Sequence, residues 1–112
     1  MSVEYVTIRD RQITLDPAGT PVDIDFEALN VDPDERAILA YNVRPAGTSE
    51  ISVALNGTRI IPELSMNSFN ARAMLENVSG GLLNNGANTV TFTLNSGDSI
   101  GVSDIHMTFK TL

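Results

Sequence analysis

Residues 89–94 read Thr-Val-Thr-Phe-Thr-Leu, the most regular stretch of the chain. Val90, Phe92 and Leu94 alternate with three threonines, so one face of the segment is apolar and the other is polar. A period of two is typical of a β-strand that buries one face, and β-branched side chains pack well on a pleated surface. The stretch therefore predicts a strand of a β-sheet protein.

The same alternation recurs along the chain, and helical periodicity almost never does. Residues 22–27 alternate apolar with acidic side chains, and residues 51–55 alternate apolar with small ones. Residues 37–43 are apolar at nearly every position, which predicts a central strand covered on both faces. Residues 69–78 fit either a strand or a short helix, and the β pattern around them favours the strand.

Local signals also predict a bulge and a hairpin. The apolar parity of the last segment switches after Val102, and one extra residue near Ser103-Asp104 would return Ile105 to the core. Residues 56–57 are Asn-Gly, a pair that accepts positive φ and connects the two strands of a hairpin.

The chain has 112 residues, and 42% of them are hydrophobic, which is enough to bury one core. Turn-forming residues separate the apolar runs at intervals of about 8–12 residues. We therefore expect an all-β, single-domain, jelly-roll-like β-sandwich over residues 1–112, with about eight mostly antiparallel strands. The absence of cysteine excludes disulfides, cysteine zinc sites and thiol nucleophiles.

The net charge of −7 argues against nucleic acid as a partner, because an acidic surface repels phosphates. No apolar run approaches the roughly 18 residues that span a bilayer, so we expect no membrane partner. The first residues lack the basic and apolar regions of a secretory signal peptide. We therefore expect a location in the cytoplasm or in a virion or similar assembly.

Three stretches carry a resemblance to a known superfamily: Ile51–Gly57, Gly81–Phe92 and Gly101–Phe109. The first is a strand that ends in Asn-Gly. The second is a two-leucine turn that leads through Gly-x-Asn into a strand, and the third is a closing strand with an aspartate among apolar residues. Over roughly residues 38–109 this order resembles the galactose-binding-like β-sandwich superfamily, which includes discoidin-type domains and carbohydrate-binding modules. The resemblance implies a glycan-binding role, on a fold that hosts many activities.

Within the resemblance, each residue has a physical role. Leu82 and Leu83 would plug one end of the sandwich, Gly86 would take the turn, and Asn88 would hydrogen-bond to backbone at the start of a strand.

Carbohydrate-binding members commonly present exposed aromatic rings to sugars, whereas this chain has no tryptophan. The apolar pattern assigns most of its aromatic residues to the core: Phe26, Tyr41, Phe92 and Phe109. Tyr5 and Phe69 remain as exposed platforms.

Metal-binding candidates are few. Asp32, Asp34 and Glu35 form an acidic loop whose oxygens suit Ca²⁺, although the same residues also suit a solvated turn. Asp104 matches an acidic position that helps to hold calcium in some related sugar-binding domains, and a role in a turn or bulge is the alternative. A structural Ca²⁺ is the one cofactor these residues suggest.

Asparagines gather in the second half of the chain, and their amides suit hydroxyl-rich ligands because they donate and accept together. They also suit plain turns. The ligand-binding candidates are Asn67 and Asn70, with Asp32 and Asp34, on loops at one end of the sandwich.

No catalytic machinery is visible, because nothing supplies a nucleophile, a base and an oxyanion donor together. His106, the only histidine, is expected on the polar face of its strand. Asp23, Asp25 and Glu27 are expected to face water, and are not a pair of glycosidase acids.

The sequence thus predicts a non-catalytic recognition module, with a glycan or a protein as partner and carbohydrate as the ligand class. The alternative is a structural protein, such as a small component of a phage particle or an injection machine, which would form symmetric homo-oligomers.

Overall fold

The computed structural model describes residues 2–67 and 70–112, apart from the side chain of Asn67, and its regular structure is β-strand throughout. Nine strands are described: β1 Val3–Arg9, β2 Ile13–Leu15, β3 Pro21–Ala28, β4 Ala37–Pro45, β5 Thr48–Leu55, β6 Thr58–Asn67, β7 Arg72–Val78, β8 Gly86–Gly97 and β9 Ile100–Lys110. Among these residues there is no helix that could cross a bilayer.

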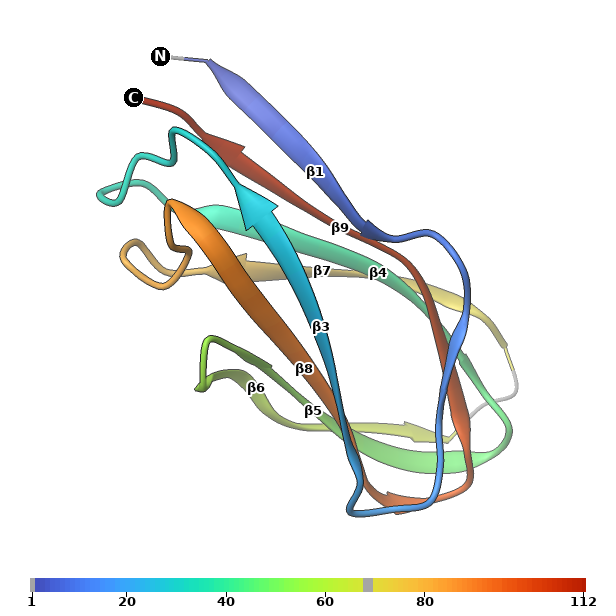
Figure 1. The fold of residues 1–112 in the computed structure, drawn as a ribbon. Coiled ribbons are helices and arrows are strands. Elements are labelled where there is room, and N and C mark those ends of the chain that lie inside the picture. The colour runs from blue at the N-terminus through green and yellow to red at the C-terminus, as the bar shows by residue number, and fades with distance from the viewer. Residues whose placement is uncertain (1, 68–69) are drawn as a thin grey trace.

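The strands form two antiparallel sheets packed face to face (Figure 1). In the five-stranded sheet the order is β1-β9-β4-β7, and β2 pairs with β9 beyond the end of β1. In the four-stranded sheet the order is β3-β8-β5-β6. This confirms the predicted all-β sandwich, with nine strands in place of about eight.

The core lies between the two sheets, as the alternation predicts. Val90, Phe92 and Leu94 of β8 are each fully buried. Phe92 packs edge-on against Tyr41 of β4, with ring centroids 5.3 Å apart and an interplanar angle of 73°. The Tyr41 hydroxyl has no hydrogen-bond partner among the described residues, and burial, followed by the charge of Glu76, raises the pKa of this phenol.

The prediction that residues 37–43 are covered on both faces is wrong. β4 is central in its sheet, between β9 and β7, but only its inward face, which includes Leu39 and Tyr41, packs on the other sheet. On the outward face, Ile38 remains 42% exposed because no second layer covers the sheet on that side.

The predicted bulge in the last strand is confirmed. Along β9, the partners of β4 shift between Ala40↔His106 and Asn42↔Ser103, so β9 carries one extra residue there. Asp104 adopts a φ of 49°, in the left-handed region that aspartate tolerates better than most residues. Val102 and Ile105 on either side are both fully buried.

Other local predictions hold as well. Asn56 and Gly57, with φ of 50° and 84°, turn β5 into β6. Residues 72–78 form strand β7 and no helix, whereas Phe69 lies outside the described residues.

The chain termini meet at one end of the sandwich (Figure 1). There the Ser2 and Thr111 hydroxyls lie 2.8 Å apart, and the Thr111 N–H donates to the Ser2 carbonyl. The predicted roles in the second half are confirmed at the same end: Leu83 is buried, Gly86 has a φ of 107°, and Asn88 bonds to backbone.

Candidate functional site

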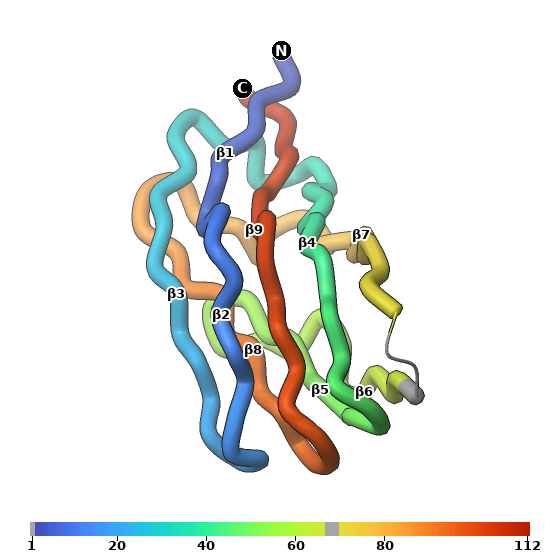
Figure 2. The backbone as a smooth tube through the Cα atoms, turned by 90° about the vertical axis from the view of Figure 1, so that its right-hand side faces the viewer, coloured from blue at the N-terminus to red at the C-terminus, as the bar shows by residue number. Residues whose placement is uncertain are grey.

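The outer face of the five-stranded sheet, which faces the viewer in Figure 2, contains two neighbouring hollows. The first, of about 400 Å³, we call the tyrosine hollow; it is lined by Tyr5, Thr7, Asp10, Asp104, His106 and Thr108. The second, of about 470 Å³, we call the arginine hollow; it is lined by Gln12, Asn42, Val43, Arg44, Ala71, Arg72, Ala73, Ser103 and Asp104. Both are lined by Asp104, so they are neighbours along β9, and we call the two together the depression along β9.

Strand register places the side chains of the tyrosine hollow. Tyr5 pairs with Thr108 and Thr7 pairs with His106, so these four residues face outward together. β9 leaves its regular path at Asp104, and there the Asp104 N–H donates to the Asp10 carbonyl at 3.2 Å. The bulge thereby joins the segment after β1 to the centre of the depression.

An exposed aromatic ring stands at one end of the depression. Tyr5 is 70% exposed, and its ring meets the His106 imidazole edge-on at 6.4 Å. His106 Nδ1 lies 3.1 Å from the Asp104 carbonyl oxygen. Because a carbonyl only accepts, Nδ1 is the donor in this contact.

The arginine hollow is lined by small side chains and by longer polar ones. Gln12 lies directly over Gly101 of β9, where an added Cβ would approach its side chain to within 2.5–2.8 Å. The small side chains of Ala73 and Ser103 also line this hollow. The Asn42 amide donates to Asp104 Oδ2 at 2.9 Å, which fixes the carboxylate between the two hollows.

Arg44 of β4 lines the arginine hollow, and residues 71–73 of the neighbouring segment border it. Arg72 of β7 pairs with the buried Val43, so its side chain leaves the sheet on the inward side, whereas Arg44, the next residue of β4, points outward. Both side chains are exposed. Within the part of the chain that the structure describes, neither guanidinium takes part in an ion pair or a side-chain hydrogen bond.

The outer face of the four-stranded sheet has polar groups that are already engaged with one another. The Thr91 hydroxyl donates to Asp23 and the Thr89 hydroxyl to Asp25, each at 2.7 Å. A hydrogen bond with Glu63, followed by desolvation and the Glu63 charge, raises the pKa of Glu50. Among the described residues no exposed aromatic side chain lies on this face.

In two further hollows, some of the polar side chains that line them are hydrogen-bonded within the protein. One, of about 450 Å³, lies at the termini, where Ser2 and Thr111 bond to each other and where Glu4, Tyr5 and Glu27 also line the hollow. The other, of about 520 Å³, is lined by Asn56 and Asn88, whose amides bond to each other and to backbone. The depression along β9 joins the exposed Tyr5 ring to polar side chains of β1, β4 and β9.

Comparison with solved structures relates this sheet geometry to known proteins. The CBM36-1 domain of a multidomain xylanase, from the hindgut metagenome of Trinervitermes trinervoides, matches 99% of both chains with a TM-score of 0.61 and 6% identity. The chain has the fold of a carbohydrate-binding module. A CBM36 module in complex with calcium and xylotriose matches 96% of this chain and 87% of that one, with a TM-score of 0.52 and 13% identity.

The same fold occurs inside a larger enzyme. A β-porphyranase of glycoside hydrolase family 86 from Bacteroides plebeius matches with a TM-score of 0.70 and 21% identity. This match covers 97% of this chain, which spans only 20% of the enzyme. No protein-family model and no curated protein matches the chain. The likeness confirms the predicted galactose-binding-like sandwich at the level of fold.

The acidic loop lies at the end of the sandwich where the termini meet, and two of its carboxylates, those of Asp32 and Glu35, have partners within the protein. Asp32 Oδ1 accepts from the Asp34 N–H at 3.0 Å, which is the geometry of a capped turn. Glu35 lies 3.4 Å from the Lys110 ammonium. The bulge residue Asp104 lies six residues before Lys110 on β9, about 20 Å away.

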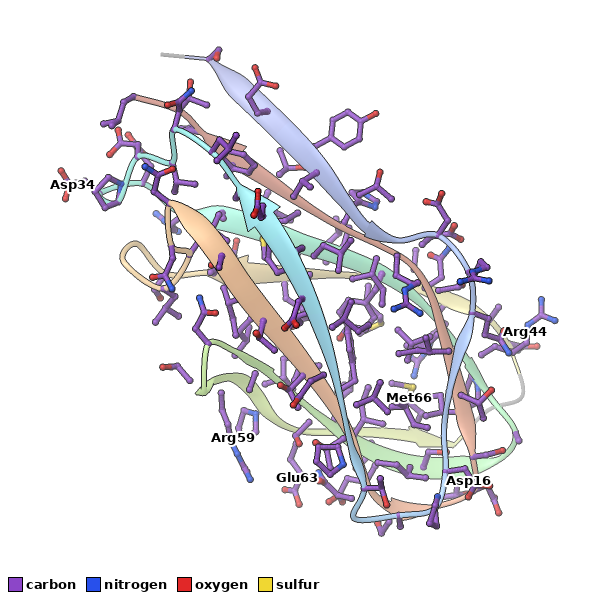
Figure 3. All side chains as sticks on the ribbon, in the orientation of Figure 1. Asp16, Asp34, Arg44, Arg59, Glu63 and Met66 are labelled. Atoms are coloured by element: carbon purple, nitrogen blue, oxygen red, sulfur yellow. The ribbon has the colours of Figure 1, made fainter. Side chains whose placement is uncertain are left out.

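The prediction that Asn70 and the acidic loop share one end of the sandwich is wrong. Asn70 precedes β7 and Asp34 lies beyond its far end, so the length of the strand, about 20 Å, separates them. Figures 1 and 3 show Asp34 and the segment before β7 at opposite ends. The side chain of Asn67, at the end of β6, lies outside the described residues.

The predicted calcium ligands do not form a ligand set in the described parts of the chain. No group of three or more acidic or histidine side chains converges there. Asp104 shares the tyrosine hollow with one other carboxylate, that of Asp10, and its own Oδ2 bonds to Asn42. Ca²⁺ usually takes six to eight oxygens, so these residues do not fit that ion.

Sequence reasoning identified Tyr5 but missed Gln12 and Arg44. Gln12 comes from the segment before β2 and Arg44 from β4, and only the strand order brings them together. The one local signal is Gly101, since a glycine inside a strand often marks a close approach by another group.

Proposed function

We propose that the protein is a non-catalytic carbohydrate-binding module and that it binds its glycan in the depression along β9. The observation that carries the proposal is an exposed tyrosine ring beside two hollows lined with hydroxyl, amide and carboxylate groups. A flat ring offers a large rigid contact at low entropic cost, and such polar groups bond to sugar hydroxyls in both directions.

The dimensions of the depression suit an extended ligand. It runs along β9 from Thr108, opposite Tyr5, to Gly101, opposite Arg44. These seven steps correspond to about 20 Å at the rise of a β-strand. A chain of several sugar units would lie along this path. The fold likeness to a CBM36 module bound to xylotriose supports a carbohydrate as the ligand class.

Several observations favour binding over catalysis. Glycosidases hold two carboxyl groups about 5–9.5 Å apart, across the scissile bond. Glu50 and Glu63 are in hydrogen-bond contact, which leaves no room for a sugar between them. Asp23 and Asp25 face water and accept bonds from threonines. Two solved structures that match along most of both chains are carbohydrate-binding modules, which further supports this assignment.

A glycan array followed by isothermal titration calorimetry tests the proposal. Tyr5→Ala should weaken binding of the best glycan about tenfold or more, because losing a stacked aromatic contact costs on the order of 1–3 kcal/mol. Leu75→Ala is the matched control, since Leu75 is 72% exposed on the same sheet face but lines neither hollow. No binding to any glycan, or equal binding by the Tyr5 variant, contradicts the proposal.

The same titrations in CaCl₂ and in EDTA address the calcium expectation. Because the described residues supply no calcium ligand set, we expect equal affinities in the two buffers.

A further inference from the structure

Strand β7 lies at the edge of the five-stranded sheet, where it pairs with β4 on one side only (Figure 2). Arg72, Met74 and Glu76 alternate along its inward side, because their partners on β4 are buried residues. Arg72 and Glu76 are four residues apart, about 13 Å along the strand, which is too far for an ion pair within one chain. Neither side chain forms an ion pair or a side-chain hydrogen bond with any residue that the structure describes.

The two opposite charges, placed symmetrically about Met74, make β7 complementary to itself. When two copies of β7 run antiparallel with Met74 opposite Met74, Arg72 of each copy lies opposite Glu76 of the other. Side chains directly opposite each other in an antiparallel pair have Cβ atoms about 5 Å apart, which suits an ion pair. A twofold interface needs this property, because the same patch supplies both of its sides.

The outward side of β7 fits the same register. Leu75 is 72% exposed, and in the antiparallel pair it lies opposite the small side chain of Ala73 of the second copy. Burying the two leucines removes apolar surface from water, which stabilises the pair.

The other edge strands among the described residues lack this complementarity. β3 carries three acidic side chains, so two copies of it would repel each other. β6 contains Pro62, which has no N–H to donate to a further strand. β1 contacts β3 of the other sheet. β7 contains neither proline nor lysine, residues that often protect an edge strand from pairing.

The surroundings of Glu76 also favour a cation from another chain. Burial raises the pKa of its carboxyl, because the neighbouring protein displaces water that would stabilise the charge. A guanidinium from a facing arginine would supply that stabilisation, since its fork of donors matches the two oxygens of a carboxylate.

We propose that this edge binds a second copy of the chain, through antiparallel pairing of β7 about a twofold axis at Met74. Arg72 of each copy binds Glu76 of the other, and the two five-stranded sheets become one continuous sheet. Because the axis is perpendicular to the sheet, both copies present the depression along β9 on the same side. The two depressions lie five strand spacings apart, about 24 Å.

Sedimentation velocity without glycan, from micromolar to millimolar protein, tests the inference. The wild-type mass should rise from one chain toward two with concentration, as expected for a small and weak interface. Arg72→Glu and Glu76→Arg should each stay monomeric, because like charges then face each other twice. Arg11→Glu is the matched control: it changes the net charge as Arg72→Glu does, but lies exposed between β1 and β2, at the opposite edge of the sheet, and should dimerise.

A mixture of the two charge variants makes the test specific. Arg72→Glu mixed with Glu76→Arg again places a carboxylate opposite a guanidinium at both positions. The mixture should therefore contain dimers with one copy of each variant, although neither variant dimerises alone. This recovery also shows that both variants are folded.

Two results would overturn the inference. One is a wild-type protein that stays monomeric at every concentration. The other is a wild-type dimer that the two charge variants also form when each is alone, since the pairing of Arg72 with Glu76 would then not hold it. Both results leave the proposed function intact, because no glycan is present in the measurement.

Discussion

At the scale of single residues, Asn88 shows how the loops at one end of the sandwich are held. Its side chain is 3% exposed, and both polar atoms of the amide are bonded. Asn88 Oδ1 accepts from the Asn84 N–H and from the Asn56 amide, at 2.7 and 2.8 Å. Its Nδ2 donates to the carbonyls of Asn84 and Gly86. One buried side chain therefore joins the β5–β6 turn to the segment before β8.

We predict that Asn88→Ala lowers the free energy of unfolding by about 2–4 kcal/mol, because several buried backbone and amide groups lose their partner. Urea denaturation measures the change. Asn95→Ala is the control and should cost less than about 1 kcal/mol, since among the described residues the Asn95 side chain accepts one long hydrogen bond, from Ser52 at 3.3 Å. Equal losses of the free energy of unfolding in the two variants would show that the hydrogen bonds of Asn88 do not stabilise the fold.

Asp104 is a second residue whose backbone decides its role. A φ of 49° costs a β-branched side chain about 1–3 kcal/mol, whereas asparagine tolerates it and still offers an acceptor to Asn42. We therefore expect Asp104→Val to be destabilised by about that amount and Asp104→Asn to stay within roughly 0.5 kcal/mol of the wild type. If valine were tolerated equally well, the bulge would not require a left-handed residue.

At the scale of elements, the strands and the bulge follow from the alternation of side chains, because a buried face forces a period of two. The parity switch after Val102 was sufficient to place the bulge at Asp104. Whether one or both faces of β4 are buried could not be predicted in the same way. An apolar run such as residues 37–43 does not tell a strand with two buried faces from one whose outer residue, Ile38, stays exposed.

The candidate site depends on pairing between elements that are distant in sequence. The arginine hollow exists because β9 pairs with both β2 and β4, and β4 pairs with β7. No local pattern around Arg44 or Arg72 encodes that order. For the same reason, the sequence could not tell that Asn70 and Asp34 lie at opposite ends of β7.

The pairing of β5 with β6 makes a prediction about pH. Glu50 lies on β5 and Glu63 on the edge strand β6, and their hydrogen bond raises the pKa of Glu50 above its ordinary value of 4.5. The folded state therefore holds this proton more tightly than the unfolded chain. Stability is greatest below pH 4.5 as far as this group is concerned, and it falls as the pH rises through the raised pKa.

Glu50→Gln removes that fall, because the amide carries no charge and can still donate to Glu63. We expect the variant to melt at a higher temperature than the wild type at pH 7 and at the same temperature at pH 4. Glu27→Gln on β3 is the control for losing one negative charge. A difference between wild type and Glu50→Gln that is the same at both pH values would contradict the assignment.

At the scale of the whole molecule, the two sheets expose different chemical groups on their outer faces. The four-stranded sheet carries most of the acidic side chains of the regular structure, and its threonines and aspartates bond to each other. On its outer face the five-stranded sheet carries the exposed Tyr5, Arg44 and the two neighbouring hollows. An acidic chain can thus stay soluble through one face and present a different surface on the other.

The central claim is that a glycan lies along β9 on the outer face of the five-stranded sheet. The most direct measurement is a titration of ¹⁵N-labelled protein with the best array ligand, followed by two-dimensional NMR. The account predicts amide shift changes concentrated at Tyr5, Thr7, Arg44, Ser103 and His106, with little change at Thr91 and Thr93 of β8. Changes concentrated on the four-stranded sheet, or confined to the acidic loop around Asp34, would contradict it.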